Sequence, residues 1–77
     1  MAMENSEMAE TIDVRCNGEA RTVAANATLA DLVQAEGLDA GRVAVLVNGE
    51  VVRREERGQC RLRDGDAVEM LVFAGGG

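Results

Sequence analysis

TIDVRCNGEARTV, residues 11–23, contains the pattern that decides the fold. Apolar and polar residues alternate from 11 to 16, which predicts a strand with one buried face. Asn17-Gly18 follows, and this dipeptide favours the tight hairpin turn whose two central residues need positive φ. The chain is therefore expected to return as a second, antiparallel strand over 19–23.

A helix is expected shortly after this hairpin. The Thr28 hydroxyl can accept the backbone N–H of Asp31, whose carboxylate can reach back to the start of the helix, as in a capping box. Gly37 suits the left-handed position that ends a helix, with Leu38 closing over that end. The apolar positions in between recur at helical spacing: Leu29, Leu32 and Val33.

The second half of the chain repeats the strand-and-turn pattern. A strand is predicted over 42–47, and Asn48-Gly49 again favours a hairpin turn before a short return strand over 50–53. The charged stretch 54–63 indicates a surface loop, anchored by its one leucine, Leu62. The turn Asp64-Gly65-Asp66 then leads into the most apolar strand, predicted over 67–73.

One short helix can cover only one face of such a sheet, so the predicted fold class is α+β. The expected architecture is a β-grasp (ubiquitin-like) two-layer roll, with a mixed four- to five-stranded sheet and one main helix on one face. In this architecture the first and last strands lie side by side, in parallel, at the centre of the sheet. We expect residues 1–10 to be a disordered acidic leader, 11–73 the β-grasp domain and 74–77 a flexible glycine tail.

Composition excludes several classes of function. The 77 residues include no His and only one aromatic residue, and the net charge is −6. Without His there is no Ser-His or Cys-His nucleophile pair and no imidazole metal ligand, so neither catalytic residues nor a metal site are predicted. A net negative charge repels phosphate backbones, so no nucleic-acid partner is expected. No apolar stretch approaches the length of a membrane span, and the N-terminal residues do not resemble a secretory signal.

The two cysteines, Cys16 and Cys60, lie far apart and form no CxxC motif. We interpret them as small buried thiols of a reduced, cytoplasmic protein. A disulfide or a reactive thiol is the alternative, and neither has support from the neighbouring residues.

The chain ends Ala74-Gly75-Gly76-Gly77, directly after the last predicted strand. Glycine is costly to order and has no side chain to pack, so this end contributes little to folding. An extended glycine tail can instead enter a channel too narrow for any Cβ atom and place its α-carboxylate in another protein's site. A carboxylate resists nucleophiles until adenylation by ATP makes one oxygen a good leaving group. On this interpretation the functional atom is the carboxyl carbon of Gly77; the alternative is a frayed end without function.

The ordered set of motifs resembles the sulfur-carrier branch of the ubiquitin-like family. The resemblance is closest to the carriers of thiamine thiazole synthesis (ThiS) and more distant to the small subunit of molybdopterin synthase (MoaD). It extends from Thr11 to Gly77 and rests on these segments: Asn17-Gly18, Thr28-Leu29-Ala30-Asp31-Leu32, Ala44-Val45-Leu46-Val47-Asn48-Gly49-Glu50-Val51-Val52-Arg53-Arg54, Leu62-Arg63-Asp64-Gly65-Asp66-Ala67-Val68-Glu69 and Gly76-Gly77.

The resemblance implies a carrier that is not itself an enzyme. An E1-like adenylyltransferase of the ThiF/MoeB type would adenylate Gly77 with ATP, and a sulfur donor such as a cysteine desulfurase would supply the sulfur of a thiocarboxylate. A downstream synthase such as thiazole synthase would then take that sulfur. The resemblance further implies that the carrier binds no cofactor and that ATP is used by the activating enzyme. The alternatives are a carrier for molybdopterin, cysteine or homocysteine synthesis, a modifier joined to lysines, or a plain interaction module.

The last strand also indicates a partner surface. Alternation assigns Leu71 and Phe73 to the sheet face that the helix leaves open, beside Leu46, where polar residues would be expected. We interpret them as an apolar docking patch; ordinary packing at the sheet end is the alternative. The opposite face of the strand is expected to pack under the helix: Val68, Met70 and Val72. A cluster of arginines is expected to be solvated and available to an acidic partner surface: Arg53, Arg54 and Arg57.

Overall fold

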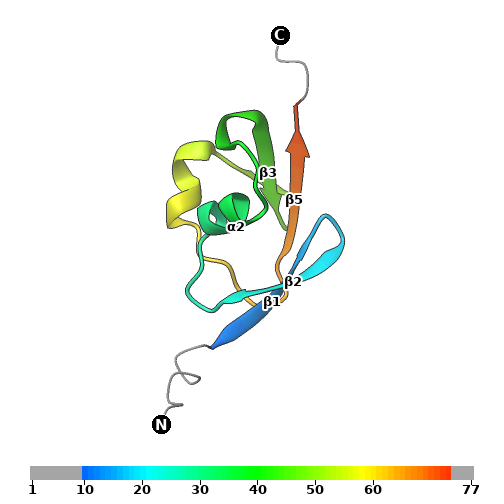
Figure 1. The fold of residues 1–77 in the computed structure, drawn as a ribbon, viewed down its shortest axis with the longest axis vertical. Coiled ribbons are helices and arrows are strands. Elements are labelled where there is room, and N and C mark those ends of the chain that lie inside the picture. Colours follow the sequence, from blue (N-terminus) through cyan, green and yellow to red (C-terminus); the bar gives the residue numbers. More distant parts are fainter. Residues whose placement is uncertain (1–9, 74–77) are drawn as a thin grey trace.

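The computed structural model describes residues 10–73 (Figure 1). The chain forms one mixed five-stranded sheet with the strand order β2-β1-β5-β3-β4. The strands are β1 (Thr11–Cys16), β2 (Glu19–Ala24), β3 (Val43–Val47), β4 (Glu50–Val52) and β5 (Ala67–Val72). One α-helix, α2 (Leu29–Ala35), and two 3₁₀ helices, η1 (Ala40–Arg42) and η2 (Arg54–Gln59), complete the described part. Nearly all of the predicted acidic leader, and the whole predicted glycine tail 74–77, lie outside the described residues.

The sheet has the predicted β-grasp arrangement. β1 and β5 pair in parallel at the centre, with Arg15 opposite Ala67 and Cys16 opposite Val68. The hairpins β1–β2 and β3–β4 flank this central pair, and β3 pairs with β5 antiparallel. The first and last strands therefore lie side by side although the rest of the domain separates them in sequence (Figure 1).

The two Asn-Gly turns do more than reverse the chain. Asn17 and Asn48 have φ of 53° and 52°, and the glycine after each also has positive φ, as the predicted tight turn requires. Each asparagine side chain also bonds to β5. Asn17 accepts from the N–H of Met70 (2.8 Å) and donates to its carbonyl (3.2 Å), while Asn48 accepts from the N–H of Ala67 (3.0 Å). The two turns thus hold the central strand from both sides.

Helix α2 begins and ends as the sequence predicts. Thr28 Oγ1 accepts the N–H of Asp31 (3.2 Å), and the Asp31 carboxylate accepts the N–H of Thr28 (2.9 Å), which completes the capping box. At the other end, Gly37 has φ 76°, and the N–H of Leu38 donates to Val33 O (3.3 Å). With the N–H of Gly37 on Gln34 O this forms the Schellman pattern that satisfies the last helical carbonyls.

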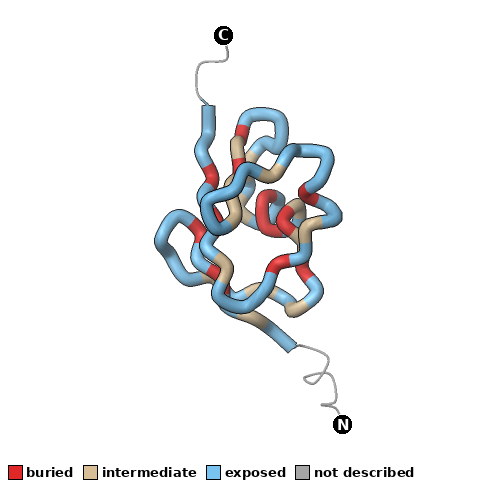
Figure 2. The backbone as a smooth tube through the Cα atoms, turned by 180° about the vertical axis from the view of Figure 1, so that it is seen from behind, coloured by how far each residue is buried: buried red, intermediate tan, exposed pale blue. Residues whose placement is uncertain are grey.

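The core lies between α2 and one face of the sheet, where the buried segments gather (Figure 2). Leu29 and Val45 are fully buried, and each contributes about 1.5–3 kcal/mol of apolar burial. Leu62 is buried too, so it anchors the segment before β5 as predicted, and its N–H donates to Ala27 O (3.0 Å). The buried core consists of Val14, Cys16, Ala27, Leu29, Leu32, Val33, Val43, Val45, Leu62, Val68 and Met70.

The segment 54–63 differs from the predicted irregular, solvated loop. Its first part is the 3₁₀ helix η2, and Arg57 is buried, with 5% of its surface exposed. The Arg57 guanidinium donates to Ala40 O (3.1 Å) and to Val43 O (2.7 Å), where η1 leads into β3. The prediction that Arg57 belongs to a solvated cluster is therefore wrong, because two main-chain carbonyls distant in sequence hold it inside the fold.

The predicted helix face of β5 is only partly covered. Val68 and Met70 are buried in the core, but Val72 is 57% exposed, although Val43 opposite it on β3 is buried. Strand boundaries differ from prediction by one residue in places: β3 starts at Val43 and β5 stops at Val72.

Candidate functional site

The predicted reactive end, Ala74 to Gly77, lies outside the described residues, but the structure shows where it begins. Phe73 is the last described residue, and its N–H donates to Arg42 O (2.9 Å), which continues the pairing with β3. The tail therefore follows directly from the central strand of the sheet, which pairs with β1 at Ala67 and Val68 and with β3 as far as Val72. A chain of four residues can extend about 13 Å beyond this point.

An apolar patch lies beside this exit, on the sheet face opposite α2. We call it the open-face patch, and it consists of Ala44, Leu46, Val51, Leu71 and Phe73. The register places Ala44 opposite Leu71 and Leu46 opposite Val51, so side chains from β3, β4 and β5 adjoin. The exposed fractions are 69% for Val51, 54% for Leu71 and 59% for Phe73. Apolar side chains gathered at this exposure are typical of a surface that another protein covers.

The rest of this sheet face carries polar side chains and small alanines. Glu69 lies opposite Leu46 and borders the patch. On β1 and β2, Asp13 and Thr22 face each other, and the Thr22 hydroxyl donates to the Asp13 carboxylate (3.0 Å). The open-face patch is thus confined to the half of the sheet from which the tail leaves.

The structure brings Leu71, Phe73 and Leu46 to one face, as the sequence predicts, but it does not add the arginines to them. Arg53 is exposed at the start of η2 and its Nε lies 3.6 Å from the Glu55 carboxylate. Arg54 lines a pocket between η2 and α2, on the helix side of the sheet. The predicted partner surface therefore divides into an apolar face and a separate basic region.

The two thiols are free. Burial, and next the charge of Glu36, raise the pKa of the Cys16 thiol, which keeps it protonated and unreactive. Cys60 is half-buried, and its carbonyl accepts the N–H of Leu29 (2.8 Å). Within residues 10–73, Cys, Asp and Glu side chains form no cluster that could hold a metal ion. The same part of the chain has no helix that is long and apolar enough to cross a membrane.

Sequence reasoning missed some contributors to the surface. Val51 belongs to the open-face patch, and its place between Glu50 and Val52 in a short alternating strand was the signal that could have found it. The strand bonds made by the Asn17 and Asn48 side chains had no such signal, because their partners on β5 are distant in sequence.

The profile of the ThiS family matches residues 14–77, which include the terminal glycines. The crystal structure of the thiamine biosynthesis protein ThiS from Geobacter metallireducens is similar to this one, with a TM-score of 0.73. The two sequences are 39% identical, and the match covers 86% of this chain and all of that one. The solution structure of a thiamine biosynthesis protein from the same organism is also 39% identical, with a TM-score of 0.71 over 86% of this chain and 88% of that one.

A curated relative extends well beyond this chain. It is a thiazole synthase of Paramagnetospirillum magneticum, 39% identical over 61 residues, and the match covers 79% of this chain but only 19% of that protein. The family profile, the β-grasp fold and the ordered motifs agree, and the resemblance inferred from the sequence is confirmed. This chain belongs to the ThiS family.

Proposed function

We propose that this protein is a sulfur carrier of thiamine thiazole synthesis. The observation that carries the proposal is the family match that continues to Gly77, together with a fold whose central strand leads directly into the glycine tail. The solved relatives with the same fold are thiamine biosynthesis proteins, and their identity of 39% supports the same pathway here.

The chemistry takes place at the C-terminal carboxylate. An E1-like adenylyltransferase of the ThiF/MoeB type transfers AMP from ATP to Gly77 and releases pyrophosphate. The persulfide of a sulfur donor, such as a cysteine desulfurase, then attacks the acyl adenylate, and AMP leaves as an acyl disulfide forms. A second thiol cleaves the sulfur–sulfur bond of this acyl disulfide, forms a disulfide with the donor cysteine, and releases the C-terminus as a thiocarboxylate. The carrier provides the acyl group and no acid, base or metal, which agrees with a sequence that contains no His.

The glycine tail and the open-face patch have different roles in recognition. Gly75, Gly76 and Gly77 have no Cβ atoms, so they fit a narrow channel that leads to the adenylation site. The open-face patch docks on the activating enzyme and later on the synthase. Because the patch lies next to the tail, the domain can dock at the mouth of the channel while only the tail enters it. ATP is bound by the activating enzyme, so the carrier itself holds no cofactor.

Thiazole synthase is the expected acceptor of the sulfur. A thiazole synthase contains the segment that matches this chain, which supports a direct partnership between the two activities. We place the protein in the cytoplasm, where ATP is available and where free thiols such as Cys16 and Cys60 stay reduced.

The acceptor is tested with a carrier prepared chemically as its C-terminal thiocarboxylate. Incubated with the host thiazole synthase and its substrates, it should return to the carboxylate mass as thiazole forms. Ala74→Gly, which removes a Cβ from the tail, should be consumed at the normal rate, whereas Gly76→Ala, which adds one, should be consumed much more slowly. Consumption only by a molybdopterin synthase, or covalent ladders on host proteins, would refute the thiazole assignment.

A further inference from the structure

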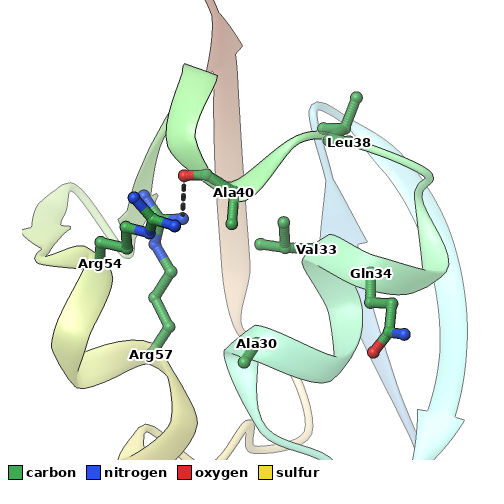
Figure 3. Close-up of a pocket in the computed structure, with 7 residues that line it drawn as sticks. All are labelled: Ala30, Val33, Gln34, Leu38, Ala40, Arg54 and Arg57. Carbon is green, nitrogen blue, oxygen red and sulfur yellow. Dashed lines mark hydrogen bonds between the residues drawn. The ribbon is translucent and has the colours of Figure 1, made fainter.

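A second recessed site lies between α2 and η2, on the helix side of the sheet (Figure 3). The pocket has a volume of about 340 Å³, within the range of small-ligand sites. One part of its lining is apolar and comes from Ala30, Val33 and Leu38. The other part is formed by Arg54 and Arg57, whose guanidinium groups both extend toward the carbonyl of Ala40 in Figure 3.

Arg57 carries a buried positive charge without a carboxylate partner in the described part of the chain. Its two terminal nitrogens donate to main-chain carbonyls, while Nε is shielded from solvent and has no hydrogen-bond partner. Carbonyl dipoles stabilise a guanidinium only in part, and an unpaired buried charge is costly. The pocket therefore has a residual positive potential that an anion would neutralise.

Arg54 adds a second guanidinium at the same place. Its terminal nitrogen lies 3.5 Å from the point where a Cβ on Gly41 would stand, so the side chain lies over this glycine. Among residues 10–73, no acidic side chain comes within 4.0 Å of it; the ion pairs are made by Arg21 and Arg53 instead. The Asp39 carboxylate also lies beside Gly41, with its Oδ1 3.5 Å from the same Cβ position, but it makes no ion pair with Arg54. Although the chain has a net charge of −6, both guanidinium groups thus remain available to an external anion.

We propose that this pocket binds a carboxylate carried on a short aliphatic group. The carboxylate contacts Arg54 and neutralises the charge of Arg57 behind it, and the aliphatic part packs on Ala30, Val33 and Leu38. A phosphate fits less well, because it would bring a larger charge and three acceptor oxygens against a lining that is mostly apolar. The carboxylate can belong to a free acid or to a glutamate side chain of another protein, since both offer the same group.

The pocket is separate from the surfaces assigned to sulfur transfer. It lies on the α2 side of the sheet, whereas the open-face patch lies on the opposite side, so both can be occupied together. Binding here requires neither the tail nor an activating enzyme, and a failure of this proposal would leave the proposed sulfur carriage untouched.

The test is a titration of the ¹⁵N-labelled full chain, followed by NMR at constant ionic strength. Sodium isobutyrate is the probe, and isobutyramide, its neutral isostere, is the control for charge. We expect saturable shifts at the backbone amides of Ala30, Val33 and Leu38 with isobutyrate and none with isobutyramide. Inorganic phosphate, in a third series, should bind more weakly than isobutyrate.

Two matched variants remove one positive charge each. Arg54→Gln should weaken isobutyrate binding about tenfold, the loss expected for one charged contact, whereas Arg53→Gln, the neighbouring arginine outside the pocket, should change it less than about twofold. Arg57 is left intact because its carbonyl bonds support the fold. Titration with N-acetylglutamate N′-methylamide, which mimics a glutamate within a protein chain, identifies the source of the carboxylate. Tighter binding than that of isobutyrate indicates a glutamate side chain of another protein, and weaker binding indicates a free acid. Unsaturated shifts, equal effects of the two variants, or tighter binding of phosphate would overturn the proposal.

Discussion

Leu71 and Phe73 are expected to act in recognition and not in folding, and changing both to serine tests this directly. They lie on the open face of β5, while Val72 between them points to the helix side and is equally exposed. Leu71→Ser/Phe73→Ser should therefore impair activation by the adenylyltransferase, and Val72→Ser should not. The control shares the strand, the exposure and the chemistry of the change, and differs in the face.

The exposed fractions set the expected size of both effects. Complete burial of such a side chain contributes about 1.5–3 kcal/mol, and Leu71 and Phe73 are less than half buried in the free protein. The double variant should thus lose about 2 kcal/mol of unfolding free energy and Val72→Ser about 1 kcal/mol, which leaves both folded. In a docked complex the remaining apolar area of two central side chains is covered, so kcat/KM for the carrier should fall at least about 30-fold.

The assay is ATP–pyrophosphate exchange by the purified host adenylyltransferase, with the carrier below its KM. Unfolding free energies come from urea titrations of the same samples. A double variant that unfolds at the assay temperature would show that Leu71 and Phe73 belong to the core. Equal losses of kcat/KM in the double variant and in Val72→Ser would refute the assignment of the docking face.

Three further results are expected. Arg57→Ala should lower the unfolding free energy by about 3 kcal/mol in urea titrations, because two buried carbonyls lose a charged donor. The control Arg53→Ala should change it by less than about 0.5 kcal/mol. Similar losses in the two variants would contradict a structural role for the buried Arg57. Native Cys60 should react with a thiol reagent at pH 8 well before Cys16, whose raised pKa and burial keep it as a protected thiol, as mass mapping would reveal; faster labelling of Cys16 would be inconsistent with this. Asn17→Ala should cost about 2 kcal/mol, since it strains the positive φ and frees two groups on β5; an unchanged urea midpoint would show that these bonds contribute nothing.

Local signals explain why most of the fold could be predicted. The Asn-Gly turns, the capping box at Thr28 and the helix end at Gly37 each depend on residues within a few positions of one another. Alternation along β5 then assigned Leu71 and Phe73 to the open face, because the side-chain period of a strand is two. The parallel pairing of β1 with β5 came from the architecture as a whole, since no local pattern encodes it.

The errors arose where tertiary contacts outweighed local chemistry. The run of five charged residues from Arg53 to Arg57 predicts solvation. Arg57 is nevertheless buried, because it donates to the carbonyls of Ala40 and Val43, which are at least 14 residues away. Val72 follows the core pattern but is exposed, although Val43 opposite it is buried. Alternation assigns a residue to a face of the sheet and does not determine whether that residue is covered. The pocket beside Arg54 could not be predicted from the sequence either, because it forms only where α2 and η2 meet in the folded chain.

The central claim, that the carboxylate of Gly77 carries sulfur, is tested most directly by intact mass. The protein is incubated with ATP, a sulfide source and host extract, beside a form that lacks Gly76 and Gly77. We predict a mass increase equal to the exchange of one oxygen for sulfur, absent from the truncated form. An unchanged mass of the full chain, in an extract that activates another carrier, would contradict the account.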